Sequence, residues 1–242
     1  MRRQTRLLGC VFVAAVLAVS GCTESADRAD GKSAAGAPRP KPMPGTGAGE
    51  EAWQPAAGEV LPGMVDVSEA RTQLAGLKVA PEGPMTGFGR SRHAHWLGQD
   101  QQCDVPEFVL KRDGRGVKRD ADCRAVSGTW KSLYDGQVIS DPAKLGIDHV
   151  VSLAAAWRSG ANTWDEAKRK EFANDLARPQ LLTVSADSHR AKGDRSPDAW
   201  QPPDKASWCT FGRAWTTVKA YYGLTATEAE KTVLTTMLDT CP

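Results

Sequence analysis

Hydrophobic and polar residues are distributed unevenly along the chain of 242 residues, and three regions can be distinguished. Residues 7–19 form one apolar run, residues 23–63 hold almost no large apolar side chains, and from about Leu74 onward aromatic and branched residues recur regularly. A segment rich in Ala, Gly and Pro cannot bury enough surface to fold. We therefore expect residues 23–63 to be a disordered tether and residues 64–242 to form a single domain, whose size suits one core.

Within the predicted domain, three stretches show the spacing of apolar residues that is typical of helices. Two of them begin with a Thr that precedes a Glu by three residues, which is the pattern of a capping box. The predicted helices are residues 163–176, with Thr163 and Glu166; residues 208–222, closed by Gly223; and residues 225–241, with Thr225 and Glu228.

Short runs of branched and aromatic residues predict strands. They cover residues 108–113, 136–139, 147–151 and 181–185. Because Ser185 is a good helix cap, we expect the last strand to lead directly into a helix that carries His189 in its first turns, facing back toward the strands. Short strands among longer helices predict an α+β fold with small sheets.

The first 22 residues have the organisation of a secretory signal. Three arginines lie near the start, the apolar run follows, and small residues precede Cys22. Residues 19–22, Val-Ser-Gly-Cys, resemble a bacterial lipobox, so we expect Cys22 to be lipidated; the alternative is an ordinary signal peptide that is cleaved nearby. No later stretch reaches the roughly 18 to 20 apolar residues that a membrane span needs. These features predict an exported protein, either held on the outer face of the cell membrane by lipid alone or secreted.

The balance of charge gives no sign of a polyanionic partner. The full chain has a formal net charge of +2, and loss of the three signal arginines leaves 28 basic against 29 acidic residues, or about −1. A strongly basic protein would indicate such a partner. Here any contact with nucleic acid must come from local clusters of cations.

Cysteine usage predicts two disulfides. Once the signal segment is set aside, an even set of cysteines remains in an exported domain, which favours disulfide bonds. Of the three pairings that four cysteines allow, we predict the one that joins sequence neighbours and closes two loops of modest length. A four-cysteine zinc site is the alternative, but the closely spaced cysteine pairs of such sites are missing. The predicted bonds are Cys103–Cys123 and Cys209–Cys241.

An acid and an imidazole, Asp148 and His149, interrupt the apolar run of residues 146–157. In a regular strand two neighbouring side chains point to opposite faces, so both cannot be buried on one side. At the end of a strand, however, they can flank one small site. The predicted helix with His189 would then face that site, and Asn174 lies between the two predicted strands.

The order Asp148-His149, Asn174 and His189 resembles the His-Asn-His order of HNH endonucleases, which fold as a ββα-metal, or His-Me finger, motif. More closely, residues 146–203 are similar to secreted HNH endonuclease family proteins related to the C-terminal domain of GmrSD-type restriction enzymes. Where that family usually has Asn, this chain has His189, and an imidazole nitrogen and an amide oxygen can both coordinate a divalent ion.

The resemblance extends beyond these residues, through flanking stretches such as CDVPEFVLKRDG and CTFGRAWTTVKAYYGLT, and covers roughly residues 84–242. It implies a ββα-metal core over about residues 146–195, embedded in a mostly helical single domain with two disulfides.

The resemblance also implies a role for each site residue. His149 would be the general base, since a neutral imidazole with an ordinary pKa of about 6.5 is competent near neutral pH. Asn174 would fix the loop that carries His149, and Asp148 and His189 would hold one divalent ion, Mg²⁺ or Mn²⁺. A solvated surface charge is the alternative for any cation near the site. The cations expected to contact the substrate are Arg90, Arg190 and Lys192.

The predicted function is therefore that of an extracytoplasmic, metal-dependent HNH endonuclease. Its expected partner is nucleic acid, DNA in preference to RNA, bound without sequence preference by a monomer. One alternative is a non-catalytic, lipid-anchored binding protein that keeps the same fold. Another is a metal-dependent hydrolase of a different phosphodiester.

Overall fold

Helices and two small antiparallel sheets make up the part of the chain that the structure describes, so the predicted α+β class is confirmed. The computed structural model describes residues 61–93, 96–98 and 103–242, all within one compact unit, Glu51–Pro242. The predicted signal segment, Cys22 and the predicted tether up to residue 60 lie outside these residues.

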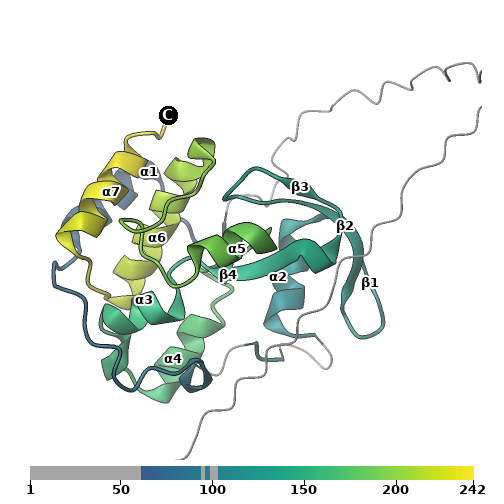
Figure 1. The fold of residues 1–242 in the computed structure, drawn as a ribbon, viewed down its shortest axis with the longest axis horizontal. Coiled ribbons are helices and arrows are strands. Elements are labelled where there is room, and N and C mark those ends of the chain that lie inside the picture. The colour runs from purple at the N-terminus through teal and green to yellow at the C-terminus, as the bar shows by residue number, and fades with distance from the viewer. Residues whose placement is uncertain (1–60, 94–95, 99–102) are drawn as a thin grey trace, which may run out of the picture. The chain divides into compact units, whose positions relative to one another are not determined.

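The described elements follow one another as helices, then strands, then mostly helices (Figure 1). The α-helices are α1 (Val67–Gly76), α2 (Val105–Asp113), α3 (Leu153–Arg158), α4 (Glu166–Ala173), α5 (Ala186–Lys192), α6 (Trp208–Tyr222) and α7 (Glu228–Leu238). The strands are β1 (Arg115–Arg119), β2 (Ala125–Lys131), β3 (Val138–Ile139), β4 (Leu145–His149) and β5 (Leu181–Ser185). Short 3₁₀ helices are η1 (Arg90–Arg92), η2 (Pro142–Lys144), η3 (Ala161–Thr163) and η4 (Lys205–Ser207). In this part of the chain no helix has the length and apolar character that crossing a membrane would require.

The first sheet contains β1, β2 and β3 in that order, and α2 packs against it. Trp130 of β2 is fully buried, and its indole Nε1 donates to the carbonyl of Leu110 in α2 at 2.8 Å. A Cβ at Gly114, the residue after α2, would clash with the Trp130 ring, so this close approach requires glycine. The disulfide Cys103–Cys123 joins the residue before the cap of α2 to the turn between β1 and β2.

The second sheet is the antiparallel pair of β4 and β5, and all five residues of β5 are buried. Asp148 is paired with Leu182 and His149 with Leu181, and paired residues lie on the same face of a sheet. Leu181 packs against α2, whereas Leu182 and Val184 belong to the main core. The strand therefore directs Asp148 and His149 to opposite faces.

Two side chains at the end of α2 complete the hydrogen bonding of β5. Arg112 Nη2 donates to the carbonyl of Leu181 at 2.6 Å, and a carboxylate oxygen of Asp113 accepts from the backbone N–H of Thr183 at 2.8 Å. An edge strand exposes such groups for pairing with another chain. Here α2 covers them and holds the β4–β5 pair in place.

The main core lies among α1, α3, α4, α6 and α7, and α6 packs beside α7 and α1 (Figure 1). Phe211 and Trp215 are the largest fully buried apolar side chains that α6 contributes to this core. The disulfide Cys209–Cys241 ties the first turn of α6 to the end of the chain, with Cα atoms 4.9 Å apart. Both predicted disulfide pairings are thus confirmed.

The predicted helix 208–222 is confirmed as α6, with Gly223 in the left-handed region at φ 65°. The next helix begins later than predicted, because Ala226 forms an extended bridge with Val79 and the capping box is made by Thr227 and Glu230.

The predicted helix 163–176 also begins later than its pattern suggested. Thr163 lies in the 3₁₀ turn η3, and Asp165 caps α4, its side chain accepting from the backbone N–H of Lys168 at 2.8 Å. Asn174, predicted to lie inside this helix, is its C-cap residue.

The predicted strand 108–113 is wrong, because this segment belongs to α2 and runs to the end of that helix. Asp104 caps the helix and forms a capping box with Glu107, and Pro106 occupies the first turn, where it is compatible with a helix. The other three predicted strands overlap β3, β4 and β5, whereas β1 and β2 carried no strand prediction.

Candidate functional site

Asp148 and His189 approach each other from different elements. Asp148 lies in β4, and His189 lies in α5, which follows β5 directly. His189 Nε2 is 3.3 Å from Asp148 Oδ1. A Cβ at Gly146 would lie 2.6 Å from His189 Nδ1, so the imidazole ring rests against a glycine backbone that no other residue could offer. The β4–β5–α5 unit thus brings together two residues that are far apart in sequence.

The second carboxylate oxygen of Asp148 is held by two buried donors. The Tyr134 hydroxyl donates to Asp148 Oδ2 at 2.5 Å, and Lys192 Nζ lies 2.8 Å from the same oxygen. Tyr134 is fully buried, and burial together with the neighbouring Asp148 charge raises the pKa of its hydroxyl well above the usual value. The phenol therefore stays protonated and acts as a donor.

Lys192 was predicted to contact the substrate, and the structure corrects this. Its side chain is fully buried, because α5 turns it inward onto β4. Besides Asp148, its ammonium group reaches the backbone carbonyl of His149 at 2.9 Å. A lysine enclosed in this way contacts the site residues and not a ligand outside them.

His149 lies on the other face of β4, with 7% of its surface exposed. Its Nε2 is 2.9 Å from the backbone carbonyl of Ala173, the last residue of α4. A carbonyl can only accept, so this contact puts a proton on Nε2, and in the neutral imidazole the lone pair is then on Nδ1. The Trp96 ring is stacked on the imidazole, with centroids 5.2 Å apart and planes inclined by 23°.

Asn174 holds the surroundings of His149. Its Oδ1 accepts from the backbone N–H of Leu97 at 3.1 Å, and its Nδ2 donates to the carbonyl of Lys170 at 2.8 Å. Leu97 follows Trp96, and Ala173 precedes Asn174. The Asn174 amide therefore fixes the segment whose indole covers His149. It also fixes the end of α4, where the Ala173 carbonyl accepts the hydrogen bond from His149.

The turn after Asn174 is fastened by Asp175, which is buried. One carboxylate oxygen of Asp175 accepts from the Tyr222 hydroxyl at 2.8 Å and from Arg178 Nε at 2.5 Å. The other oxygen accepts from the backbone N–H of Ala177 at 2.9 Å. The connection that carries Asn174 is thereby anchored to α6.

The start of α5 is fastened to the turn between β2 and β3. Ser185 caps α5, and its hydroxyl donates to Asp135, next to Tyr134. Although partial burial raises the pKa of the Asp135 carboxyl, hydrogen bonds from the Ser185 hydroxyl and the backbone N–H of Gln137 help to hold the pKa below its usual value. This turn therefore positions both Tyr134 and the helix that carries His189.

The two predicted arginines lie on the surface near α5. Arg90 pairs with Asp194, just beyond α5, at 2.9 Å, and Arg190 pairs with Asp187 within the helix. Each guanidinium remains largely exposed, with 61% and 70% of its side-chain surface accessible. Exposed ion pairs are weak, so neither pairing prevents these cations from contacting a ligand.

The donor atoms of Asp148 and His189 fit a single divalent cation. Two atoms that bind one cation at about 2.1 Å and roughly at right angles are about 3 Å apart, close to the 3.3 Å between Asp148 Oδ1 and His189 Nε2. Among the residues that the structure describes, no group of three or more His, Cys, Asp or Glu could hold a metal. A cation here would therefore have two protein ligands and complete its shell with water or substrate oxygen.

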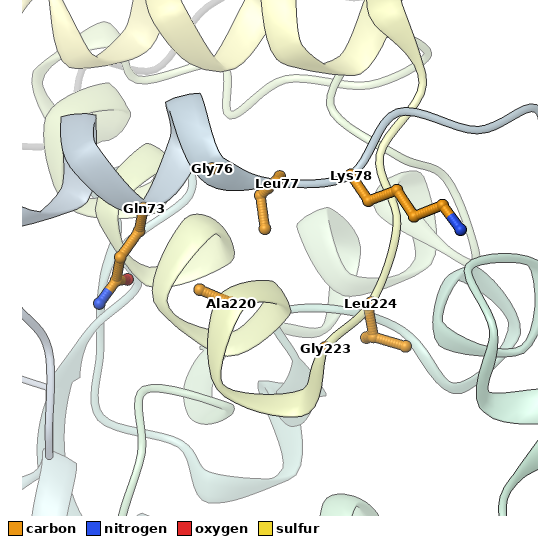
Figure 2. Close-up of a pocket in the computed structure, with 7 residues that line it drawn as sticks. All are labelled: Gln73, Gly76, Leu77, Lys78, Ala220, Gly223 and Leu224. Atoms are coloured by element: carbon orange, nitrogen blue, oxygen red, sulfur yellow. The ribbon is translucent and has the colours of Figure 1, made fainter.

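A pocket of about 360 Å³ lies elsewhere, between the end of α1 and the end of α6 (Figure 2). None of its lining residues belongs to the Asp148 cluster, and its polar side chains are Gln73 and Lys78. It offers no pair of groups for acid–base chemistry, so the β4–β5–α5 unit remains the candidate site.

Comparison with known proteins assigns the domain to a nuclease-related class. Residues 109–237, which include the whole β4–β5–α5 unit, match the family described as GmrSD restriction endonucleases, C-terminal domain. The chain belongs to this family. It is also 45% identical over 180 residues to an uncharacterized secreted protein of Arthroderma benhamiae, which covers 74% of this chain and 88% of that relative. No solved structure matches the chain.

Three residues that shape the site were missed by the sequence analysis: Tyr134, Gly146 and Trp96. Gly146 begins the apolar run that contains Asp148. The two residues are two positions apart and so lie on the same face of the strand, and this spacing could have identified Gly146 as a neighbour of the site. Tyr134 and Trp96 come from distant segments, and no spacing relative to Asp148 or His149 could have revealed them.

Proposed function

We propose that this protein is an extracytoplasmic, metal-dependent HNH endonuclease that hydrolyses the phosphodiester bonds of nucleic acid, DNA in preference to RNA. The observation that carries this proposal is the approach of His189 to Asp148 across the β4–β5–α5 unit. His149 follows Asp148 in β4, although its side chain lies on the opposite face of the strand. Membership of a restriction endonuclease family supports it. In this proposal the three elements are the ββα-metal core.

The chemistry of phosphodiester hydrolysis requires stabilisation of the phosphoryl oxygens and a base for the attacking water. A divalent cation, Mg²⁺ or Mn²⁺, bound by Asp148 and His189 would supply the first by acting as a Lewis acid. His149 supplies the second: the lone pair on Nδ1 takes the proton from water. The Ala173 carbonyl, which accepts from Nε2, then stabilises the imidazolium that forms. The products carry 5′-phosphate and 3′-hydroxyl ends.

Arg90 and Arg190 are the proposed contacts to the nucleic-acid backbone. Both lie at or near α5 and remain exposed. Contacts to phosphate alone carry no sequence information, so binding without sequence preference follows from such a site.

We further propose that the protein is exported and held by a lipid on Cys22. Two disulfides in the described domain are typical of proteins outside the cytoplasm. The relative from Arthroderma benhamiae is described as secreted, which supports export.

A plasmid-nicking assay tests the enzyme activity. The full chain, purified with its disulfides formed, is incubated with supercoiled DNA and Mg²⁺ or Mn²⁺, and with RNA in parallel. We expect nicked and linear DNA, complete loss of cutting with a chelator, and recovery on adding excess metal. An identically prepared His149→Ala variant controls for contaminating nucleases. Cutting that survives chelation would contradict metal dependence, and no cutting of either polymer would favour the non-catalytic binding protein.

Trp96 is expected to position His149 for catalysis. Its backbone lies in the left-handed region at φ 60°, which is uncommon for a bulky residue and persists where the surroundings hold it in place. Replacing Trp96 by leucine removes the stacked ring, so we expect kcat to fall by about ten- to a hundredfold with little change in KM. Trp96→Phe keeps an aromatic ring there and should restore most of kcat. Equal losses in the two variants would show that stacking does not matter.

A further inference from the structure

The charge of Asp148 is already neutralised inside the protein. Lys192 Nζ lies 2.8 Å from Asp148 Oδ2, and both side chains are withdrawn from solvent, with 0% and 3% of their surface exposed. Two charges at this distance and depth are barely screened by salt, so their interaction is strong. Lys192 also donates to the carbonyl of His149, which locks the ammonium group in place.

This pairing affects what the site can bind. Affinity for a hard divalent cation rises with the number of charged ligands around it. The proposed cation has two protein donors, and an imidazole must be neutral to bind it. Because Lys192 cancels the charge of Asp148, the protein alone offers the cation a nearly neutral pair of donors. A bound phosphodiester would supply the cation with the negative charge and the additional oxygen ligands that the protein does not provide.

Resting on the proposed function, we infer that Lys192 is a permanent counterion of Asp148 that makes binding of the divalent cation depend on the phosphodiester. The free protein binds the cation weakly, and the cation and the nucleic acid strengthen each other's binding. This coupling is reciprocal by thermodynamic necessity. Lys192 is thus a positioning residue that acts through Asp148.

The test measures Mn²⁺ binding, not turnover, through the electron paramagnetic resonance signal of the free ion. The full chain with His149→Ala, which should not cut, is titrated alone and with a short DNA duplex. We expect Mn²⁺ to bind at least about tenfold more tightly with the duplex. Ions bound by the duplex itself are subtracted with a protein that also carries Asp148→Asn.

A matched pair of variants separates charge from packing. Lys192→Met and Tyr134→Phe each remove one donor to Asp148 Oδ2, but only the first removes a charge. Without the duplex, we expect Lys192→Met to bind Mn²⁺ at least about tenfold more tightly than the protein that carries His149→Ala alone. Tyr134→Phe, which keeps the charge of Lys192, should change Mn²⁺ binding clearly less. Weaker or unchanged binding by a folded Lys192→Met, with the fold checked by circular dichroism, would overturn the inference.

The comparison with and without the duplex decides the question even if Lys192→Met does not fold. Tight Mn²⁺ binding that the duplex leaves unchanged would overturn the counterion role, while metal-dependent nicking would still support the endonuclease. No Mn²⁺ binding in either condition would overturn both.

Discussion

Replacing His149 by alanine should lower the rate of phosphodiester cleavage by about 10²- to 10⁴-fold, the range that a positioned general base contributes. The reason is the geometry of the imidazole: Nε2 donates to the Ala173 carbonyl and the Trp96 ring covers one face, so the lone pair is confined to Nδ1 in one orientation. In the proposed mechanism, alanine leaves the attacking water without a base. The binding of nucleic acid, for which we propose the exposed Arg90 and Arg190, should change little.

The measurement is single-turnover cleavage of a labelled DNA duplex at saturating enzyme, with thermal melting of each variant. His149→Gln is the matched control, because an amide can still donate to the Ala173 carbonyl but cannot take up a proton. We expect both variants to lose cleavage, while glutamine keeps more of the melting temperature than alanine does. Cleavage by either variant at the parent rate would remove His149 from the proposed mechanism.

The meeting of Asp148 and His189 could be anticipated because the information is local. Ser185 ends a strand and caps a helix at once, so the strand leads directly into α5, and His189 falls in its first turns. The partner strand was marked by its apolar run. A short strand pair followed at once by a helix leaves little freedom in where the helix lies.

The misassigned segment before β1 shows a limit of sequence patterns. Phe108, Val109 and Leu110 form an apolar run that suits a strand as well as a helix. The helix is set by residues earlier in the chain, where Asp104 and Glu107 form the capping box. A pattern judged from the run alone therefore leads to the wrong element.

The burial of Lys192 could not be predicted, since long basic side chains are usually exposed. Sequence spacing gives the helix on which a lysine lies but not the depth at which its ammonium group ends. That depth depends on Tyr134 and Asp148, which approach from the β2–β3 turn and from β4. The same reasoning applies to Trp96, which meets His149 across a separation of more than 50 residues.

The largest expected effect on stability lies at Lys219, outside the candidate site. This side chain is fully buried in α6, and its ammonium group contacts Glu230 at 2.6 Å, Ser159 Oγ at 3.0 Å and the carbonyl of Thr225 at 2.8 Å. Burial lowers the pKa of Lys219 from its usual value, against the attraction of Glu230. Glu230 in turn accepts from Trp215 Nε1 at 2.5 Å and belongs to the capping box of α7. The network joins α6, α7 and the loop between them.

Replacing Lys219 by methionine should therefore lower the free energy of unfolding by about 3 to 5 kcal/mol, because it leaves the buried Glu230 carboxylate without its cation. For a domain of this size the melting temperature should fall by roughly 6 to 20 °C. Arg71→Met is the control: Arg71 forms an ion pair with Asp239 in which both side chains are about half exposed, so its loss should cost about 1 kcal/mol or less.

Adding Glu230→Gln to Lys219→Met distinguishes the loss of charge from the loss of packing. The glutamine amide oxygen can still accept from Trp215, but it carries no charge into the core. We expect the double variant to melt higher than Lys219→Met alone, since an unpaired buried charge costs more than an unpaired buried dipole. If the double variant instead melts lower than both single variants, by the sum of their losses, the two side chains act independently and the network adds nothing beyond its separate contacts.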